Sequence, residues 1–178
     1  MLAHVVLIDA LNLIRRIYSV QERPFLLNNE LSDATKQQVL FNTKSACLKA
    51  VSNILEIQNP SHALLVFDSQ QPCWRYKVYP DYKKGRKKMP EHLASMLEDF
   101  QDALFDMGVD SLTSESDEAD DLIATLAIKV ALRGQNVTIV STDKGFLSLL
   151  NQHIHVYDYF NRRYLDADYV KEKFDVKP

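Results

Sequence analysis

The chain has 178 residues, of which 46% are hydrophobic and 25% are charged, and its formal net charge is −3. These values are typical of one globular domain over residues 1–178 and exclude global disorder. No apolar run approaches the length of a membrane span, and the first residues do not read as a signal peptide. Cys47 and Cys73 are not spaced as metal ligands. We therefore expect a cytoplasmic protein with reduced thiols and no membrane association.

Apolar runs rich in branched residues alternate with helical periodicity along the chain. Strands are predicted at 4–8, 62–67 and 136–140, with weaker candidates at 109–112 and 153–157. Helices are predicted at 33–57, 90–107, 117–133 and 143–150. The strong strands lack polar alternation, which is typical of strands covered on both faces. The sequence therefore predicts an α/β fold with a mostly parallel central sheet flanked by helices.

Residues 69–90 form the one long stretch without clear periodicity, and a loop of that length in a compact domain usually has a function. Its central part, RYKVYPDYKKGRKK (75–88), is dense in lysine and arginine, has a single acidic residue and contains three tyrosines. Lysine and arginine neutralise phosphates, and tyrosine rings stack on bases. The segment predicts an anion-binding surface, with a solvated basic loop as the alternative.

Carboxylates are predicted to gather at one edge of the sheet. Asp9, Asp68 and Asp143 each follow a predicted strand, and the carboxyl ends of parallel strands share an edge. Glu118, Asp120 and Asp121 begin a helix at that same edge. A helix N-terminus offsets only about 0.3–1 kcal/mol per negative charge, too little to hold such a cluster together. Oxygen ligands without cysteine or paired histidine predict a bound hard cation, Mg²⁺ with Mn²⁺ as a substitute. The alternative for any single aspartate is a turn or helix-cap residue.

A carboxylate-bound Mg²⁺ usually meets phosphate oxygens. Two such ions about 4 Å apart activate water and stabilise the leaving oxygen of a phosphodiester. The sequence has no glycine-rich loop of the GxxxxGK[ST] type, which disfavours hydrolysis of nucleotide triphosphates.

Several motifs in this order resemble the 5′-nuclease superfamily, which includes the 5′–3′ exonuclease domain of bacterial DNA polymerase I and the flap endonucleases. These are VLIDALNLIRRIY, VFDS, RYKVYPDYKKGRKKMP, DEADDLIATLA and STDKGFLSLL. The EADD and YPxYKxxR patterns together are highly specific. Among subgroups, the chain looks most like bacterial exonuclease IX-type flap endonucleases, which share DALNLIRRI and STDKG.

The resemblance implies a Mg²⁺-dependent, structure-selective 5′ nuclease of DNA replication and repair, with a PIN-like N-terminal fold. Its partner would be DNA with single-stranded 5′ ends or flaps, and we expect a monomer. Residues 69–90 would form a basic helical arch in which Lys83 and Arg86 contact the scissile phosphate. The metal ligands would be the six carboxylates: Asp9, Asp68, Glu118, Asp120, Asp121 and Asp143. The remaining DNA-binding candidates are Arg16, Arg75, Tyr82, Lys84, Lys87 and Lys88.

Two departures from the family pattern keep alternatives open. Gly145 stands where the family often has a second aspartate, which weakens a second metal site. The family's helix–hairpin–helix segment, which grips duplex DNA and supplies a K⁺ site, would follow Pro178, so we expect that DNA-binding region and its K⁺ site to be absent from this sequence. The alternatives are a catalytically weak or silent module that binds flap DNA, and a PIN-like ribonuclease or phosphatase.

Overall fold

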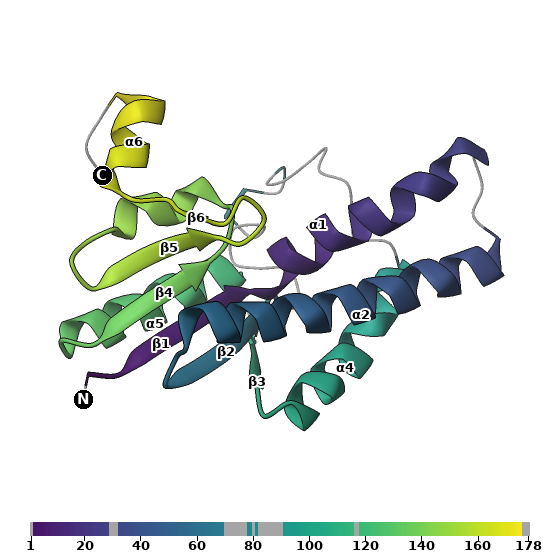
Figure 1. Ribbon diagram of the computed structural model, residues 1–178, viewed down its shortest axis with the longest axis horizontal. Coiled ribbons are helices and arrows are strands. Elements are labelled where there is room, and N and C mark those ends of the chain that lie inside the picture. Colours follow the sequence, from purple (N-terminus) through teal and green to yellow (C-terminus); the bar gives the residue numbers. More distant parts are fainter. Residues whose placement is uncertain are drawn as a thin grey trace.

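The computed structural model describes residues 2–28, 32–69, 78–79, 81, 91–115 and 118–175. At its centre is a six-stranded sheet in the order β3-β2-β1-β4-β5-β6 (Figure 1). All neighbouring strands are parallel except β5 and β6. The prediction of a mostly parallel sheet is therefore confirmed. The strands are β1 (His4–Asp9), β2 (His62–Phe67), β3 (Asp110–Thr113), β4 (Asn136–Val140), β5 (Ile154–Asp158) and β6 (Arg163–Tyr164).

Each of the four predicted helical segments is helical in the structure, and further helical elements lie toward both ends of the chain. The segment predicted at 33–57 is one helix, whereas the segment predicted at 143–150 is a short 3-10 helix, η2, as is common for single-turn pieces. The helix α1 and the short elements η1, β6 and α6 were not among the predicted segments. The helical elements are α1 (Ala10–Glu22), η1 (Arg23–Asn28), α2 (Asp33–Gln58), α4 (Glu91–Asp106), α5 (Ala119–Leu132), η2 (Lys144–Leu149) and α6 (Ala167–Phe174).

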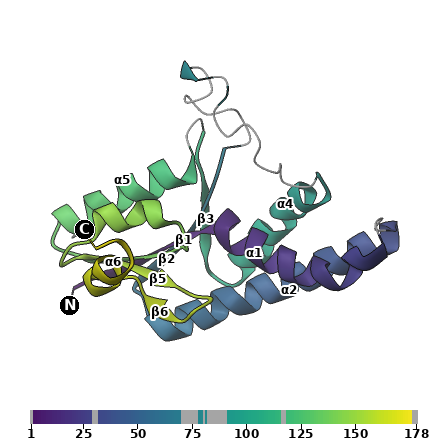
Figure 2. The ribbon, with the colours of Figure 1, turned by 90° about the horizontal axis from the view of Figure 1, so that it is seen from above.

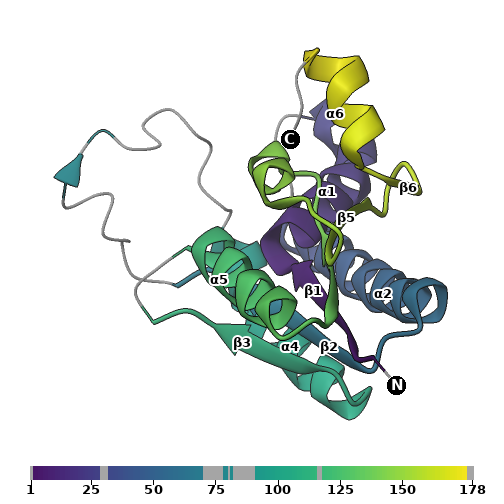
Figure 3. The same cartoon turned by 90° about the vertical axis from the view of Figure 1, so that its left-hand side faces the viewer.

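The helices cover both faces of the sheet and enclose two apolar cores. On one face, Ile8 and Leu65 pack with residues of α1, α2 and α4, including Phe100. On the other face, Leu7 packs with Ile123 of α5 and with residues of β4, β5, η2 and α6. Figures 2 and 3 show α5 and α2 on opposite sides of the sheet. Because side chains of a strand alternate between its faces, the unbroken apolar run of β1 serves both cores.

This layering exposes one functional edge. Since β1, β2, β4 and β5 are parallel, their carboxyl ends lie at the same edge, and α1 starts there and runs outward beside α2 (Figure 1). No helix in the described ranges is long and apolar enough to span a membrane.

Candidate metal centre

Asp9 ends β1 and lies at the centre of the carboxyl edge. It is 5% exposed. Its Oδ1 accepts a long bond from the Asn12 backbone N–H (3.5 Å), which caps α1, and its Oδ2 accepts from the Ser141 hydroxyl (3.0 Å). Burial raises its pKa to about 6; the bond from Ser141 opposes this rise, and the neighbouring Asp68 and Asp143 carboxylates add to it. Ionisation of a buried carboxyl group beside two other carboxylates is unfavourable unless a cation binds next to it.

Asp68 follows β2 and connects that strand to the head of α5. Its Oδ1 accepts a bond from the Ala119 backbone N–H (2.6 Å). The N-cap residue of α5 is Glu118, whose own side chain makes no capping bond. Asp68 thus satisfies a first-turn amide that a local cap would otherwise take. This contact brings the carboxylate of β2 to the carboxylates of α5.

Asp120 shows most clearly that the acids converge. Its pKa is raised to about 7, first by burial and then by the nearby Asp9, Asp143 and Asp68 carboxylates, with Asp143 acting also through a hydrogen bond between the two side chains. Asp143 in turn accepts a bond from the Gly145 backbone N–H on its Oδ1 (2.8 Å). Aspartates from three strand ends and one helix therefore form one electrostatic cluster, as the sequence analysis predicted for these four residues.

Glu118 and Asp121 also lie at the head of α5, but in different positions from those expected. The helix begins at Ala119, so Glu118 is its cap residue rather than part of its first turn, which holds Asp121. The later start follows from the bond that Asp68 makes to Ala119. Both side chains are half-buried. Their participation in metal binding stays a prediction.

Three polar residues support the cluster, and none of them is among the predicted metal ligands or DNA-binding candidates. The Asn12 Nδ2 donates to Thr142 Oγ1 (2.9 Å), and the Thr142 backbone N–H donates to Asn12 Oδ1 (3.1 Å). Ser141 bonds both to Asp9 and to the backbone of Asp143. The sequence signal is weak: Asn12 lies one helical turn after Asp9, and Ser141 and Thr142 precede Asp143.

Asp158 also ends a strand at this edge, yet its surroundings are those of a structural residue. It is buried, and it accepts bonds from the backbone N–H groups of Phe160 and Asn161 and from the Asn161 side chain. These bonds hold the turn between β5 and β6. The turn that follows β5 therefore uses both carboxylate oxygens of Asp158.

Of the basic candidates, the structure describes Arg16. It is exposed on α1, and its guanidinium carbon lies 5.1 Å from the centre of the Phe160 ring, within the range of a cation–π contact. Its role in DNA binding stays a prediction. The other basic and aromatic candidates lie outside the described residues: Arg75, Tyr82, Lys83, Lys84, Arg86, Lys87 and Lys88.

The donor set of the cluster fits a hard divalent cation, because all four side chains offer carboxylate oxygens. Within the described ranges, no group of three or more Asp, Glu, His or Cys side chains lies close enough together to hold a metal ion. Mutual repulsion gives the physical reason, because without a cation like charges in a partly buried site stay apart. An ion would draw the oxygens inward.

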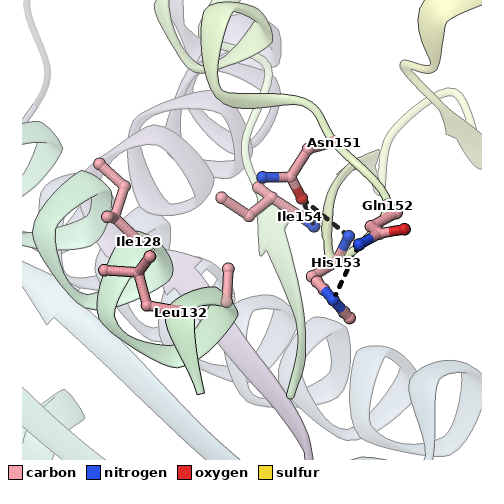
Figure 4. A pocket seen from close by; sticks show the side chains of 7 residues that line it. Ile128, Leu132, Asn151, Gln152, His153 and Ile154 are labelled. Carbon is pink, nitrogen blue, oxygen red and sulfur yellow. Dashed lines mark hydrogen bonds between the residues drawn. The ribbon is translucent and has the colours of Figure 1, made fainter. Parts of the chain in front are cut away.

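A pocket of about 470 Å³ lies elsewhere, at the opposite edge of the sheet. Figure 4 shows Ile128 and Leu132 of α5 facing the segment Asn151–Ile154 that leads into β5. Its lining is mostly apolar and contains no carboxylate. This pocket is thus separate from the acidic cluster.

The chain is an α/β domain with a mostly parallel sheet, and aspartates at the ends of three strands and at the head of a helix give it an acidic site at the carboxyl edge. The chain belongs to the family of 5′–3′ exonuclease N-terminal, resolvase-like domains, whose family model matches residues 4–175. The family resemblance drawn from the motifs is therefore confirmed.

Curated relatives and solved structures agree with this assignment. A flap endonuclease Xni from Colwellia psychrerythraea is 64% identical over 182 residues, covering 99% of this chain and 63% of the relative. One from Photobacterium profundum is 46% identical over 180 residues, covering 100% of this chain and 65% of the relative. The chain thus spans just under two thirds of these relatives. The T5 D15 protein, crystallised with metal ions, has the same fold, with a TM-score of 0.71, 18% identity and coverage of 97% of this chain and 61% of that one.

Proposed function

We propose that this chain carries the metal site of a divalent-metal-dependent 5′ nuclease that hydrolyses phosphodiesters in DNA with 5′ flaps or single-stranded 5′ ends. The observation that carries the proposal is the electrostatic coupling of Asp120 to Asp9, Asp68 and Asp143 at the carboxyl edge. Relatives that bear the name flap endonuclease support the activity, and a bacteriophage T5 flap endonuclease complex with DNA and metal ions supports the substrate.

The four aspartates would hold the ion, with Glu118 and Asp121 as further candidates. When bound, Mg²⁺ or Mn²⁺ would activate a water molecule and stabilise the leaving oxygen of the phosphodiester. The protein's own part is to hold the carboxylates close together. Burial excludes water around Asp9, while the bond from the Ala119 amide holds Asp68 in place. Lys83 and Arg86 of the basic segment would neutralise charge on the scissile phosphate.

The finer expectations belong to the same proposal. The protein would act as a monomer in the cytoplasm, in DNA replication and repair. A K⁺ site would belong to the part of such nucleases that binds duplex DNA beyond the matched domain. Gly145 in place of a second aspartate favours one alternative, a module that binds flaps but cuts them weakly or not at all.

The test is cleavage of a labelled 5′-flap DNA with Mg²⁺ and with EDTA, by the wild type and by Asp120→Ala. Asp33→Ala is the matched control, because Asp33 also lies in the first turn of a helix but is exposed and remote from the cluster. We expect Mg²⁺-dependent cutting that Asp120→Ala abolishes and Asp33→Ala retains. Flap binding without cutting would contradict the nuclease and favour the alternative, a module that binds flap DNA. Preference for an RNA flap would indicate the PIN-like ribonuclease.

A further inference from the structure

Ser141 lies between Asp9, which ends β1, and Asp143, which precedes η2. It is 3% exposed, and its backbone N–H donates to the Tyr157 carbonyl of β5 (3.2 Å), which fixes it to the sheet. Its hydroxyl donates to Asp9 Oδ2 (3.0 Å) and accepts from the backbone N–H of Asp143 (3.0 Å). One buried side chain therefore joins Asp9 to the loop that carries Asp143.

The direction of these bonds follows from the chemistry of a hydroxyl group, which has one proton to donate and lone pairs to accept with. The Asp143 amide can only donate, so it uses a lone pair of Ser141 Oγ, and the Ser141 proton is left to point at Asp9. Among the described residues, Asp9 Oδ1 accepts only the long 3.5 Å bond from Asn12. Ser141 thus holds one oxygen of Asp9 and leaves the other weakly engaged beside the acidic cluster.

Asn12, in the first turn of α1, makes a second link to the loop after β4. Its backbone N–H donates to Asp9, and its side chain exchanges bonds with Thr142, 130 residues away in the sequence (2.9 Å from Nδ2 to Oγ1 and 3.1 Å from the Thr142 N–H to Oδ1). An amide side chain that both donates to and accepts from one residue fixes its orientation. The junction of β1 and α1 and the loop after β4 are therefore held together at two points.

We propose that Ser141 and Asn12 form a hydrogen-bonded clamp that holds the Asp9 and Asp143 carboxylates in place for a divalent cation. Ser141 is then a positioning residue of the metal centre. The inference rests on the proposed function, since it concerns the same site. Residues that orient ligands typically contribute about 10–100-fold to metal affinity.

A substitution at Thr138 is the control that distinguishes a positioning role of Ser141 from a purely structural one. It lies on β4, is 2% exposed, and its Oγ1 pairs with His4 Nε2 (2.8 Å) near the opposite edge of the sheet. Like Ser141 it is a buried hydroxyl on or next to β4 with a side-chain partner from β1. Its loss should weaken the fold without reaching the carboxylates.

The experiment is Mn²⁺ binding measured by isothermal titration calorimetry on wild type, Ser141→Ala, Ser141→Thr and Thr138→Val. We expect Ser141→Ala to weaken Mn²⁺ binding about 10-fold. Ser141→Thr, which keeps the hydroxyl, should recover most of that affinity, and Thr138→Val should bind as tightly as the wild type. Calorimetry reports the site directly, so the result does not depend on nuclease activity.

Wild-type affinity in Ser141→Ala, or an equal loss in Thr138→Val, would overturn the clamp and leave the proposed nuclease standing if the wild type binds Mn²⁺ and cuts flaps. If Ser141→Ala does not fold, Asn12→Ala replaces it, with the same expected loss and the same contradicting result. A wild-type protein that does not bind Mn²⁺ would overturn both the clamp and the proposed function.

Discussion

The two ends of the parallel strands differ in their electrostatics: the strands start at the amino edge of the sheet and end at its carboxyl edge. At the amino edge, polar groups are paired: His4 contacts Thr138 (2.8 Å), and Asn151 accepts from the His153 backbone N–H (2.7 Å). At the carboxyl edge, acids face acids, and Asp9 and Asp120 have pKa values raised to about 6 and about 7. The amino edge is stabilised by its own contacts, whereas the carboxyl edge gathers acids whose negative charges repel one another.

The edges therefore respond to pH in opposite directions. A carboxyl group with a raised pKa in the folded state favours folding below its unfolded value, near 4, and loses that contribution as pH rises toward 7. His155, near the amino edge, has a pKa lowered by burial and then by His4 and His153. It favours folding above its unfolded value, near 6.5, and loses that contribution as pH falls. Destabilisation concentrated at one edge is typical of a functional site.

The largest effect is expected from Asp120→Asn, which removes a charge but keeps the shape. Flap cleavage should fall by about 10²-fold or more, beyond what residues that only orient ligands contribute. In EDTA at about pH 8, the variant should be more stable than the wild type by about 1–2 kcal/mol, after allowance for solvent screening, because the repulsion from Asp9 and Asp143 is gone. Denaturant unfolding checks this, and a less stable variant would contradict the account of the edge.

The second-largest effect is the stabilisation of the wild-type protein by bound Mg²⁺. At a concentration of about 100 times its dissociation constant, Mg²⁺ adds about 2.7 kcal/mol and raises Tm by about 5 °C or more at pH 8. The gain should shrink near pH 5.5, because Asp9 and Asp120 then hold protons that compete with the ion. Thermal unfolding with and without Mg²⁺ at both pH values measures this. An equal gain in Asp120→Asn would place the bound ion outside the cluster.

The sequence alone could predict the carboxylates that matter most, because their positions follow from local pattern and sheet geometry. Asp9, Asp68 and Asp143 each end a parallel strand, and the rule that such ends share an edge is sufficient to bring them together. The same rule misjudges Asp158, whose strand is followed at once by a turn that takes up its oxygens. Local pattern does not show which backbone amides will reach a carboxylate.

The features of the site that could not be predicted depend on contacts between segments that are far apart in the sequence. α5 starts at Ala119 because Asp68, from another strand, supplies the acceptor for its first amide. The bonds between Asn12 and Thr142 join segments 130 residues apart, and neither residue belongs to a local motif that requires the other. Tertiary structure, not propensity, sets such features.

The third effect concerns Gly145→Ala, next to the acidic cluster. A Cβ at this position would lie 3.2 Å from Asp143 Oδ1, so that carboxylate would have to shift by a few tenths of an ångström. We expect Mn²⁺ affinity to fall by about 3-fold, below the range for loss of an orienting residue. Ser148→Ala, exposed on the same 3-10 helix, is the control and should bind as the wild type does. Unchanged affinity in Gly145→Ala would show that Asp143 tolerates the shift.

The smallest effect is expected at the amino edge, from His155→Gln. The glutamine side chain stays neutral, so the variant should lose less stability than the wild type as pH falls from about 7 to about 5, while its stability above pH 7 and its Mn²⁺ affinity stay close to those of the wild type. The reason is that His155 is partly buried beside His4 and His153, which makes its protonation unfavourable in the folded state. Urea unfolding across this range measures the slope. If the unfolding free energy of the variant falls with pH as steeply as that of the wild type, the loss of stability at low pH comes from groups other than His155. The carboxyl edge would then be the main pH-sensitive part of the sheet.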